Sequence, residues 1–454
     1  VPSAEEADMA RTMDSRKTEG VVCDVLVVGG GAAGLAAATT AAEAGLSVIL
    51  IERYGFCGGG AVAGMSGTIC GLYLATERAN AVPEKVVHGF VDRFISGMEA
   101  MGGLSEPVQY GRTFTRVHDP DVWRCVADGL LRDSGVQVLF HVVATQVLAE
   151  GDRIEGAMCW TKEGPLEIRA GVTIDASGDA DIAAMAGLPS VIGRDGAVQN
   201  PTMIFRMANV DVARFMDEYG PDAIMPPKVS EMIAAADDTG QARLPRRKVW
   251  LFPTTRPKEL LCNCTRIIGA DGRELITLYR KDFSEAESEG RRQAREYAAF
   301  FKEHLIGCEE AYLVDTPPQV GVRQTRQIVG KDILTNDDVV TGKKRPDAIA
   351  VSPWPIELHS GERPRVEWLM EDFYHVPFGS FVPERGQGIL FAGRCLSAEH
   401  EAAASSRVTA QCFSYGQAIG LAAAISIHDG ISTDRIDGRD VRSALNEIGV
   451  ELGG

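Results

Sequence analysis

Residues 21–52 are VVCDVLVVGGGAAGLAAATTAAEAGLSVILIE, and this stretch decides the fold. The apolar, β-branched run over residues 21–28 predicts a parallel strand that is buried on both faces. Three glycines follow it, and the Ala-rich residues 32–44 predict a helix that ends at Gly45. Residues 47–52 predict a second buried strand. One strand–helix–strand unit of this size predicts an α/β domain around a parallel sheet.

The glycines between strand and helix have the G-x-G-x-x-G spacing of dinucleotide-binding turns. Gly29 permits the tight turn, and Gly31 lets the backbone approach a pyrophosphate. Gly34 lets the helix pack closely against the strand. The first turn of the helix, with Ala32 and Ala33, then faces the negative charge of the ligand. The alternative for this motif is an ordinary turn of an α/β fold.

A second glycine-rich stretch distinguishes FAD from NAD. Glu52 lies eighteen residues past Gly34, where its carboxylate would accept the ribose hydroxyls of a ligand without a 2′-phosphate. Residues 55–67, GFCGGGAVAGMSG, follow it, and so many glycines indicate backbone lying against a ligand. An NAD enzyme needs no such stretch; a flexible loop is the alternative. The residues predicted to bind cofactor here are Glu52, Arg53, Gly58, Gly59, Gly60 and Ala61.

The length of the chain and the change in residue composition along it predict two domains. At 454 residues the chain is too long for one ordinary core. We expect a flexible leader over 1–20, a discontinuous first domain over 21–195 and 386–454, and an inserted domain over 196–385. The insert is Pro-rich and holds an amphipathic helix around 285–305. The first domain returns with a strand at 389–392 and a small-residue helix over 406–428.

Charge and cysteine usage narrow the class of partner. The net charge of −17 repels nucleic acid and anionic membranes, and we expect the basic clusters 246–248 and 343–345 to be solvated loops. The sequence contains no run of eighteen apolar residues and no signal-peptide pattern at its start. The ten cysteines are scattered, which is typical of a reducing, cytoplasmic setting. Only Cys262 and Cys264 lie close together, so we expect no metal site.

Four segments together resemble a known family. They are 29–34 with Glu52 and Arg53, IDASGDAD at 174–181, GVRQTRQIVG at 321–330, and GRCLSAEHE at 393–401 with the helix after it. Spread over most of the chain, they resemble the FAD-dependent oxidoreductase family with the glutathione-reductase-type flavin fold, in the branch related to the flavin core of heterodisulfide reductases. The resemblance implies an α/β, Rossmann-like FAD-binding domain with an inserted α+β substrate domain.

The resemblance also implies further cofactor contacts. It makes Ser177 and Gly178 the second flavin-contacting turn and places Val143 near the adenine. Gly393 and Arg394 would run under the ribityl and pyrophosphate, and the next helix would point its N-terminus at the flavin. Candidate residues along or beside that helix are Arg407, Gln411, Gly416 and Gln417.

The chain departs from the family in two respects. After Gly59 the family usually has small hydroxyl residues, where this chain has Gly60, Val62 and Ala63. The iron–sulfur cysteine runs of the heterodisulfide reductase relatives are absent from the sequence.

Four side chains are candidates for catalysis. His400 lies between two glutamates, which can raise an imidazole pKa toward neutrality, and a structural histidine is the alternative. Tyr374 and His375 precede a predicted domain junction, where pockets are common. Arg323 is expected either to clamp an anionic substrate group or to brace the domain interface. Cys57 lacks the partner of a redox pair, so packing is its expected role. Covalent attachment of the flavin, to Cys57, to His88 or to another nucleophile, is left open.

These features predict an FAD enzyme that exchanges hydride with a small polar organic substrate. An external electron donor or acceptor completes the reaction, because the sequence holds no second strand–G-x-G-x-x-G–helix unit. One alternative is a flavin monooxygenase that uses NAD(P)H and oxygen. Another is a non-catalytic protein that binds FAD for electron relay within a larger assembly. A homo-oligomer is the general prior for such a chain.

Overall fold

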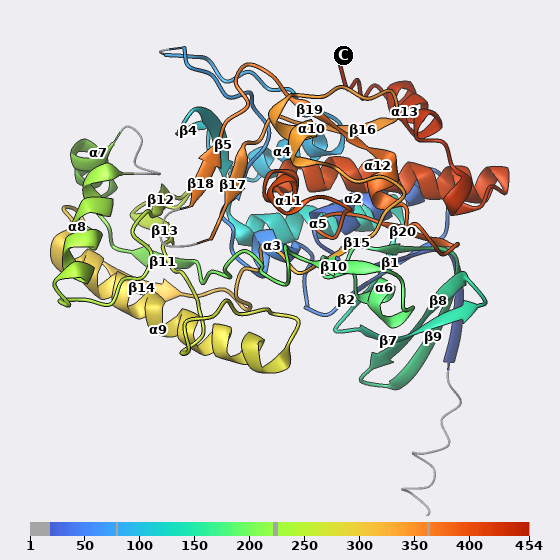
Figure 1. The fold of residues 1–454 in the computed structure, drawn as a ribbon, viewed down its shortest axis with the longest axis horizontal. Coiled ribbons are helices and arrows are strands. Elements are labelled where there is room, and N and C mark those ends of the chain that lie inside the picture. Colours follow the sequence, from blue (N-terminus) through green and yellow to red (C-terminus); the bar gives the residue numbers. More distant parts are fainter. Residues whose placement is uncertain (1–18, 79, 221–225, 361–363, 454) are drawn as a thin grey trace, which may run out of the picture.

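The computed structural model describes residues 19–78, 80–220, 226–360 and 364–453. It has two lobes, a large one at the right of Figure 1 and a smaller one at the left. We call residues 203–320 the inserted lobe, because backbone hydrogen bonds between Thr202 and Gly321 close its base, and the rest the dinucleotide lobe. The predicted leader, 1–20, lies outside the described residues apart from Glu19 and Gly20, which begin the first strand.

The dinucleotide lobe is built on a seven-stranded sheet that is parallel on one side and antiparallel on the other. Its path is β6 (Gln137–Phe140), β2 (Val48–Glu52), β1 (Glu19–Val28), β9 (Gly164–Asp175), β8 (Arg153–Thr161) and β7 (Val143–Glu150). The long strand β9 pairs along its first half with β8 and at its end with β20 (Ile389–Phe391). The ends of β1, β2, β9 and β20 therefore meet at one edge.

Each face of this sheet is covered, which explains the uninterrupted apolar run of the first strand. Val25 and Val27 of β1 face a core formed with α2 (Ala32–Glu43), α5 (Pro120–Ser134) and α12 (Thr409–Asp429). Leu26 and Val28 face a second core shared with β7, β8 and α6 (Asp181–Met185). The strand–helix–strand unit predicted from residues 21–52 is confirmed as β1–α2–β2.

The helix predicted over 406–428 is confirmed as α12, which begins three residues later than expected, at Thr409. A short helix that was not predicted, α11 (His400–Ser406), ends just before it. Val408 between them has an extended backbone and serves as the N-cap of α12. This break exposes the first turn of α12, whose N–H groups have no partner within the helix.

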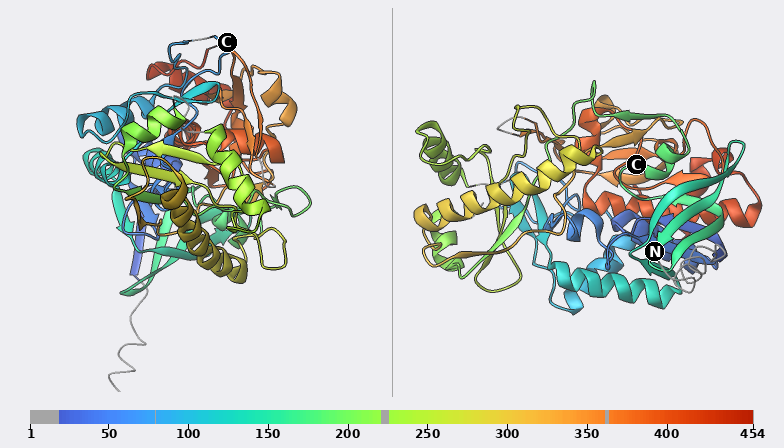
Figure 2. Two further views of the ribbon diagram at one scale, coloured as in Figure 1. Left: turned by 90° about the vertical axis from the view of Figure 1, so that its left-hand side faces the viewer. Right: turned by 90° about the horizontal axis from the view of Figure 1, so that it is seen from below.

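The inserted lobe has its own core. Strands β12 (Trp250–Pro253), β13 (Glu259–Asn263), β11 (Phe205–Ala208) and β14 (Tyr312–Asp315) form an antiparallel sheet. Helices α7 (Val212–Tyr219), α8 (Pro227–Asp238) and α9 (Arg280–His304) pack around it, and α9 runs along the outside of the lobe in the view from below (Figure 2). The helix expected around 285–305 is confirmed.

The second half of the expected insert packs elsewhere. Buried residues between Leu334 and Val382, in α10 (Asn336–Val340), β16 (Ala348–Ser352) and β19 (Tyr374–Pro377), join the helix-side core of the dinucleotide lobe. The physical reason is a shared core with α12, which contacts β16 directly. The inserted lobe, 203–320, is therefore shorter than the insert of 196–385 predicted from composition.

Small elements complete the fold and connect the lobes. They are α3 (Gly59–Val62), β3 (Thr68–Ile69), α4 (Phe90–Ala100), β4 (Val108–Tyr110), β5 (Thr113–Val117), β10 (Ser190–Ile192), β15 (Arg326–Ile328), β17 (Ile356–Leu358), β18 (Arg365–Glu367) and α13 (Gly438–Glu447). Of the helices in the described part of the chain, none is long and apolar enough to cross a membrane.

Candidate cofactor and active site

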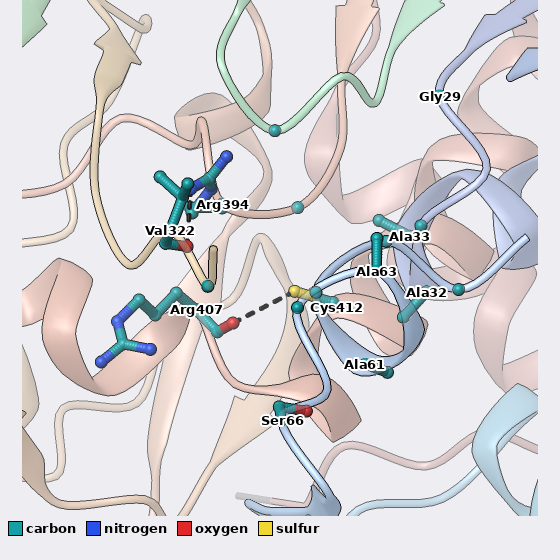
Figure 3. A pocket seen from close by; sticks show the side chains of 18 of the residues that line it. Gly29, Ala32, Ala33, Ala61, Ala63, Ser66, Val322, Arg394, Arg407 and Cys412 are labelled. Carbon is teal, nitrogen blue, oxygen red and sulfur yellow. Dashed lines mark hydrogen bonds between the residues drawn. The ribbon is translucent and has the colours of Figure 1, made fainter. Parts of the chain in front are cut away.

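One cavity of about 340 Å³ lies where the two lobes meet. Its walls come from the carboxyl edge of the parallel sheet, from residues 58–70, and from the N-terminus of α12. The inserted lobe adds Ile204, Phe252, Asn263 and Gln319. Figure 3 shows the small residues Ala32, Ala33 and Ala61 gathered along one side.

The fold brings most of the predicted cofactor residues to this cavity, although they are far apart in the sequence. Those that line it are Gly29, Gly31, Ala32, Ala33, Glu52, Arg53, Gly58, Gly59, Gly60, Ala61, Val143, Ser177, Gly178, Gly393, Arg394 and Arg407. Four of the predicted residues do not line it: Gly34, Gln411, Gly416 and Gln417.

Two kinds of glycine can be distinguished in the glycine-rich segments at the cavity. Gly29 and Gly34 are required by the protein itself, because a Cβ on Gly29 would lie 2.6 Å from the Ala176 carbonyl and one on Gly34 would lie 1.9 Å from the Gly29 carbonyl. A Cβ on Gly60 would meet no atom within 4 Å, and one on Gly31 nothing closer than 3.8 Å. At these two positions a side chain would project into space that no protein atom fills. The wall therefore fits a ligand that lies directly against backbone, as a pyrophosphate does.

Glu52 presents a fixed carboxylate to the cavity. It is 5% exposed, its Oε2 accepts a hydrogen bond from Gly30 N at 2.7 Å, and its Oε1 accepts one from Tyr54 N at 2.9 Å. Burial raises the pKa of Glu52, while these backbone bonds and Arg53 oppose the rise. The position suits a carboxylate that accepts ribose hydroxyls, and that contact stays a prediction.

Three of the motif segments are tied together at Asp179. Its Oδ1 accepts hydrogen bonds from Arg394 Nη2 at 2.7 Å and from Thr325 Oγ1 at 2.6 Å. Arg394 also donates from Nη1 to the Val322 carbonyl at 2.7 Å, the bond drawn in Figure 3. The ion pair is largely buried, so it holds Gly178 and the Gly393 turn in register along the cavity.

The N-terminus of α12 faces the cavity, with Val408, Thr409 and Cys412 on its wall. Its first turn carries no acidic residue, so the positive end of the helix dipole is not neutralised there. Side chains farther along serve packing. A Cβ on Gly416 would lie 2.0 Å from the Ala33 carbonyl, and Gln417 Oε1 accepts from Phe90 N at 2.8 Å.

Gln411 likewise turns away from the cavity. Its Nε2 donates to the Gly71 carbonyl at 2.8 Å.

A buried polar group forms another part of the wall. Tyr110 donates its hydroxyl proton to Glu357 Oε1 at 2.6 Å, and His359 Nε2 lies 3.4 Å from the same oxygen. Arg323 and Arg407 line the cavity beside them. Sequence reasoning missed Tyr110, Glu357 and His359. The signal was the i, i+2 spacing of Glu357, in β17, and His359, just after it, which in extended backbone places two side chains on the same side.

Arg246 is buried, which contradicts another expectation from the sequence. Residues 246–248 were predicted to be a solvated loop, yet Arg246 is only 2% exposed. Its guanidinium lies 4.2 Å from the centre of the Trp250 ring and donates from Nη1 to Asn263 Oδ1 at 2.8 Å. The aromatic face and the amide replace water around the charge, which a basic tripeptide in the sequence does not indicate.

Comparison with known proteins identifies the class of cofactor. The sequence profile described as FAD dependent oxidoreductase matches residues 24–445, nearly the whole chain. The chain belongs to this family of FAD-dependent oxidoreductases. FAD is therefore the dinucleotide that the glycine wall and Glu52 would hold, and the chain is an FAD flavoprotein of oxidoreductase type.

Individual relatives are more distant. Digeranylgeranylglycerophospholipid reductase from Thermoplasma acidophilum is 28% identical over 197 residues, 42% of this chain and 48% of that protein, so the chain spans about half the length of the curated relatives it matches. A 51-residue match, 55% identical, links it to 4-oxocyclohex-2-ene-1-carboxylate 5-dehydrogenase from Sinomonas cyclohexanicum, over 11% of this chain and 8% of that protein. A solved geranylgeranyl bacteriochlorophyll reductase-like structure from Thermoplasma acidophilum has a TM-score of 0.51 at 15% identity, covering 94% of this chain and 84% of that one, and shows a shared fold.

Three of the four catalytic candidates lie away from the FAD cavity. The buried Tyr374 hydroxyl is 2.7 Å from Ser405 Oγ, and His375 Nδ1 accepts from Arg345 N at 2.9 Å. His400 begins α11 and does not line the cavity either. Burial lowers the pKa of His400 despite Glu401, so the expected shift toward neutrality from flanking carboxylates is wrong. The fourth candidate, Arg323, lines the cavity.

Cys57 lies outside the cavity wall too. Its sulfur packs against Gly30, where a Cβ would be 2.5 Å away.

The charge states of the buried polar group follow from its contacts. Burial alone would raise the pKa of Glu357, but hydrogen bonds from His359 and Tyr110 and the charge of Arg407 hold it below its usual value, so Glu357 is ionised. Burial and the nearby Arg323 lower the pKa of His359 well below its usual value despite Glu357, so the imidazole is neutral. Burial and Glu357 raise the pKa of Tyr110 well above 10, so the phenol keeps its proton.

Proposed function

We propose that this chain catalyses two-electron hydride transfer between bound FAD and a small polar organic substrate. FAD supplies the hydride acceptor or donor when it is bound. The observation that carries the proposal is the cavity whose glycine wall belongs to the dinucleotide lobe and whose remaining wall includes the inserted lobe. A protein that only relays electrons needs no such second wall, whereas an enzyme needs a substrate space beside the cofactor.

The second wall suits a compact substrate with polar groups. Ile204 and Phe252 offer apolar contact, while Tyr110, Glu357 and His359 offer hydrogen bonds. The lipid reductases among the relatives are named for digeranylgeranyl chains. A long prenyl chain would offer no hydrogen bond to His359 Nδ1 and Arg407 Nε, which are buried in cavity-lining residues without a partner among the described residues. We therefore favour a smaller and more polar substrate here.

Proton exchange with the substrate is assigned to the chain of groups Tyr110, Glu357 and His359. A proton leaving the substrate would pass to the Tyr110 oxygen while the phenol proton passes to Glu357, and the reverse transfer would supply a proton. The short bond from Tyr110 to the ionised Glu357 fixes the phenol in the cavity wall. An oriented phenol at hydrogen-bond distance of a reacting group typically contributes about 10²- to 10⁴-fold to the rate. Electrons enter or leave through an external carrier or oxygen, since the sequence has no second dinucleotide unit.

The first experiment is the visible spectrum of the purified protein, followed by anaerobic mixing with NADH, NADPH and a panel of small alcohols, ketones and unsaturated acids. We expect an FAD spectrum that a panel compound bleaches, or that dithionite bleaches and an unsaturated compound restores. The absence of FAD after reconstitution would overturn the proposal. Bleaching by NADPH only in the presence of an aromatic ligand would establish the monooxygenase alternative instead.

The variant Tyr110→Phe tests the assigned proton exchange. It should lower the rate of flavin reduction or reoxidation by substrate at least 100-fold, because the phenol oxygen is lost while the ring stays in place. FAD content should be unchanged. Tyr312→Phe, on the exposed edge strand β14, is the matched control and should retain the wild-type rate. Equal rates for the two variants would remove Tyr110 from the reaction.

A further inference from the structure

Arg323 and Arg407 line the cavity, and a third arginine, Arg246 of the inserted lobe, lies close to Arg323 behind the wall. Arg323 is 8% exposed, Arg246 is 2% exposed, and Arg407 is half-buried. In the part of the chain that the structure describes, none of the three makes an ion pair with a carboxylate at 4.0 Å or less. Glu357 is the acidic group that acts on all three, and its nearest bonds go to Tyr110 and His359 instead.

Neutral acceptors hold these arginines in place. Arg323 donates from Nη1 to the Asn200 carbonyl at 2.7 Å, and its Nη2 lies 3.4 Å from Asn263 Oδ1. Arg407 donates from Nη2 to Gln199 Oε1 at 3.2 Å. Carbonyl and amide oxygens orient a guanidinium without cancelling its charge. The side chains are therefore fixed, but their positive charge is not neutralised.

The local charge does not balance. Three guanidiniums face one ionised Glu357 and a neutral His359, an excess of positive charge in a largely buried place. Burial, with Arg246 and Arg407 nearby, lowers the pKa of Arg323 far below its usual value. Buried charges without a counterion are costly, and proteins keep them where a ligand supplies the opposite charge. In addition, Arg407 Nε and Arg246 Nη2 are buried without a hydrogen-bond partner among the described residues.

We infer that this part of the cavity binds the carboxylate of a small organic acid, held by Arg323 and Arg407, with its carbon skeleton against Ile204 and Phe252. Planar guanidiniums match the two oxygens of a carboxylate. Arg246 lies behind them and adds to the positive potential. The inference deepens the proposed function, on which it rests, by naming the substrate class. Glu357 nearby favours a monoanion over phosphate, whose second charge it would repel.

Figure 3 is consistent with separate places for cofactor and acid. Arg407 and Gly29 lie on opposite sides of the pocket, and the Arg407 side chain extends away from Ala32 and Ala33. The glycine wall and the arginines thus occupy different parts of one cavity.

The test is isothermal titration of the FAD-loaded protein with benzoate, cyclohexanecarboxylate and hexanoate, each paired with its amide. At least one acid should bind tenfold or more tightly than its amide, and inorganic phosphate should compete weakly. The inference is overturned if none of the acids binds, if acid and amide bind equally, or if phosphate binds more tightly than every acid. Because the readout is binding, these outcomes are separate from a failure of turnover or of FAD incorporation.

Two variants test whether Arg323 and Arg407 hold the carboxylate of the bound acid. Arg323→Gln and Arg407→Gln should each weaken binding of the best acid tenfold or more while leaving its amide unaffected, as expected for a lost charge-assisted pair. Arg214→Gln, an exposed position paired with Glu309 on the inserted lobe, is the control and should bind like wild type. If both cavity variants lose FAD but, once reconstituted, bind the acid normally, the arginines serve the cofactor and the inference is wrong. A variant that does not fold is replaced by the corresponding lysine, which keeps the charge and loses the bidentate geometry; it should retain part of the affinity.

Discussion

At the scale of single residues, Glu52 both holds the local backbone and lines the FAD cavity. The carboxylate is buried, holds two backbone amides and lines the FAD cavity. Glu52→Ala should weaken FAD binding by about 10- to 100-fold, the range expected for lost hydrogen bonds to a charged group. Glu52→Gln keeps the shape and one acceptor oxygen, so its loss should be smaller. Quenching of FAD fluorescence on titration of apoprotein measures both, and an unchanged Kd for Glu52→Ala would contradict the ribose assignment.

His118 makes stability depend on pH. It is buried after β5 with neither ring nitrogen hydrogen-bonded among the described residues, and burial lowers its pKa from 6.5 to about 4. Between these two values the unfolded chain binds the proton and the folded protein does not. The free energy of unfolding should therefore fall by about 3 kcal/mol as pH drops from 6.5 to 4. Above pH 6.5 this residue contributes no pH dependence.

Urea unfolding of the wild type and of His118→Phe over pH 4–7.5 measures this effect. The variant should lose the corresponding part of the pH dependence, because no titrating group remains at that position. His88→Gln, at an exposed position beside Asp92, is the control and should follow the wild type. Identical pH slopes for wild type and His118→Phe would show that His118 is protonated in the folded protein.

The residues that sequence reasoning found and missed differ in a physical way. Gly31 and Glu52 belong to a contiguous motif, in which local backbone geometry and cofactor chemistry are coupled. Tyr110 and Glu357 are 247 positions apart and meet only through the tertiary fold. A single sequence carries no signal for such a pair. Arg246 was missed because burial of a guanidinium depends on Trp250 and Asn263 of the inserted sheet.

At the scale of elements, the contact between α2 and α12 depends on small residues. A Cβ on Gly416 would lie 2.0 Å from the Ala33 carbonyl, at the helix whose N-terminus lines the cavity. Gly416→Ala should therefore force the helices apart and destabilise the protein by about 1–3 kcal/mol, despite the better helix propensity of alanine. FAD affinity should fall as well, since α12 approaches the cavity by this contact.

The matched control is Gly129→Ala in α5. The nearest atom to its Cβ would be Arg132 Nη2 at 3.9 Å, so only the propensity gain of about 0.5–1 kcal/mol remains. The two substitutions should thus shift the midpoint of thermal unfolding in opposite directions. A stabilising Gly416→Ala would show that the helices are not in tight contact.

Periodicity predicted the long elements and failed for the short ones. The apolar strand β1 and the amphipathic helix α9 have patterns long enough to be unambiguous. The helix α11 was not predicted, because its seven residues, His400–Ser406, are too few to show a clear period. Strand β17, with only Ile356–Leu358, is too short for a pattern, yet Glu357 lies on it.

At the scale of the whole molecule, the family could be predicted from the sequence, but the lobe boundary could not. The four motif segments follow the order expected of the family, and the family assignment is confirmed over residues 24–445. The segment from Leu334 to Val382 was assigned to the insert from its proline content. Its packing against α12 is a long-range contact that composition does not encode.

The two lobes should respond to FAD as one unit. They have separate cores, but the FAD cavity takes its walls from both lobes. An apolar cluster that includes Met65, Trp250 and Trp354 also joins them. A further link is the ion pair from Arg256 Nε to Asp119 Oδ2 at 2.6 Å. A ligand that binds only the folded state stabilises it by about 2.7 kcal/mol at 100 times its Kd. Hydrogen exchange of apoprotein with and without FAD should therefore show slower exchange in β13 of the inserted lobe as well as in β1. Protection confined to β1 and its neighbours would mean that the inserted lobe opens independently, and that its cavity wall forms without help from the cofactor.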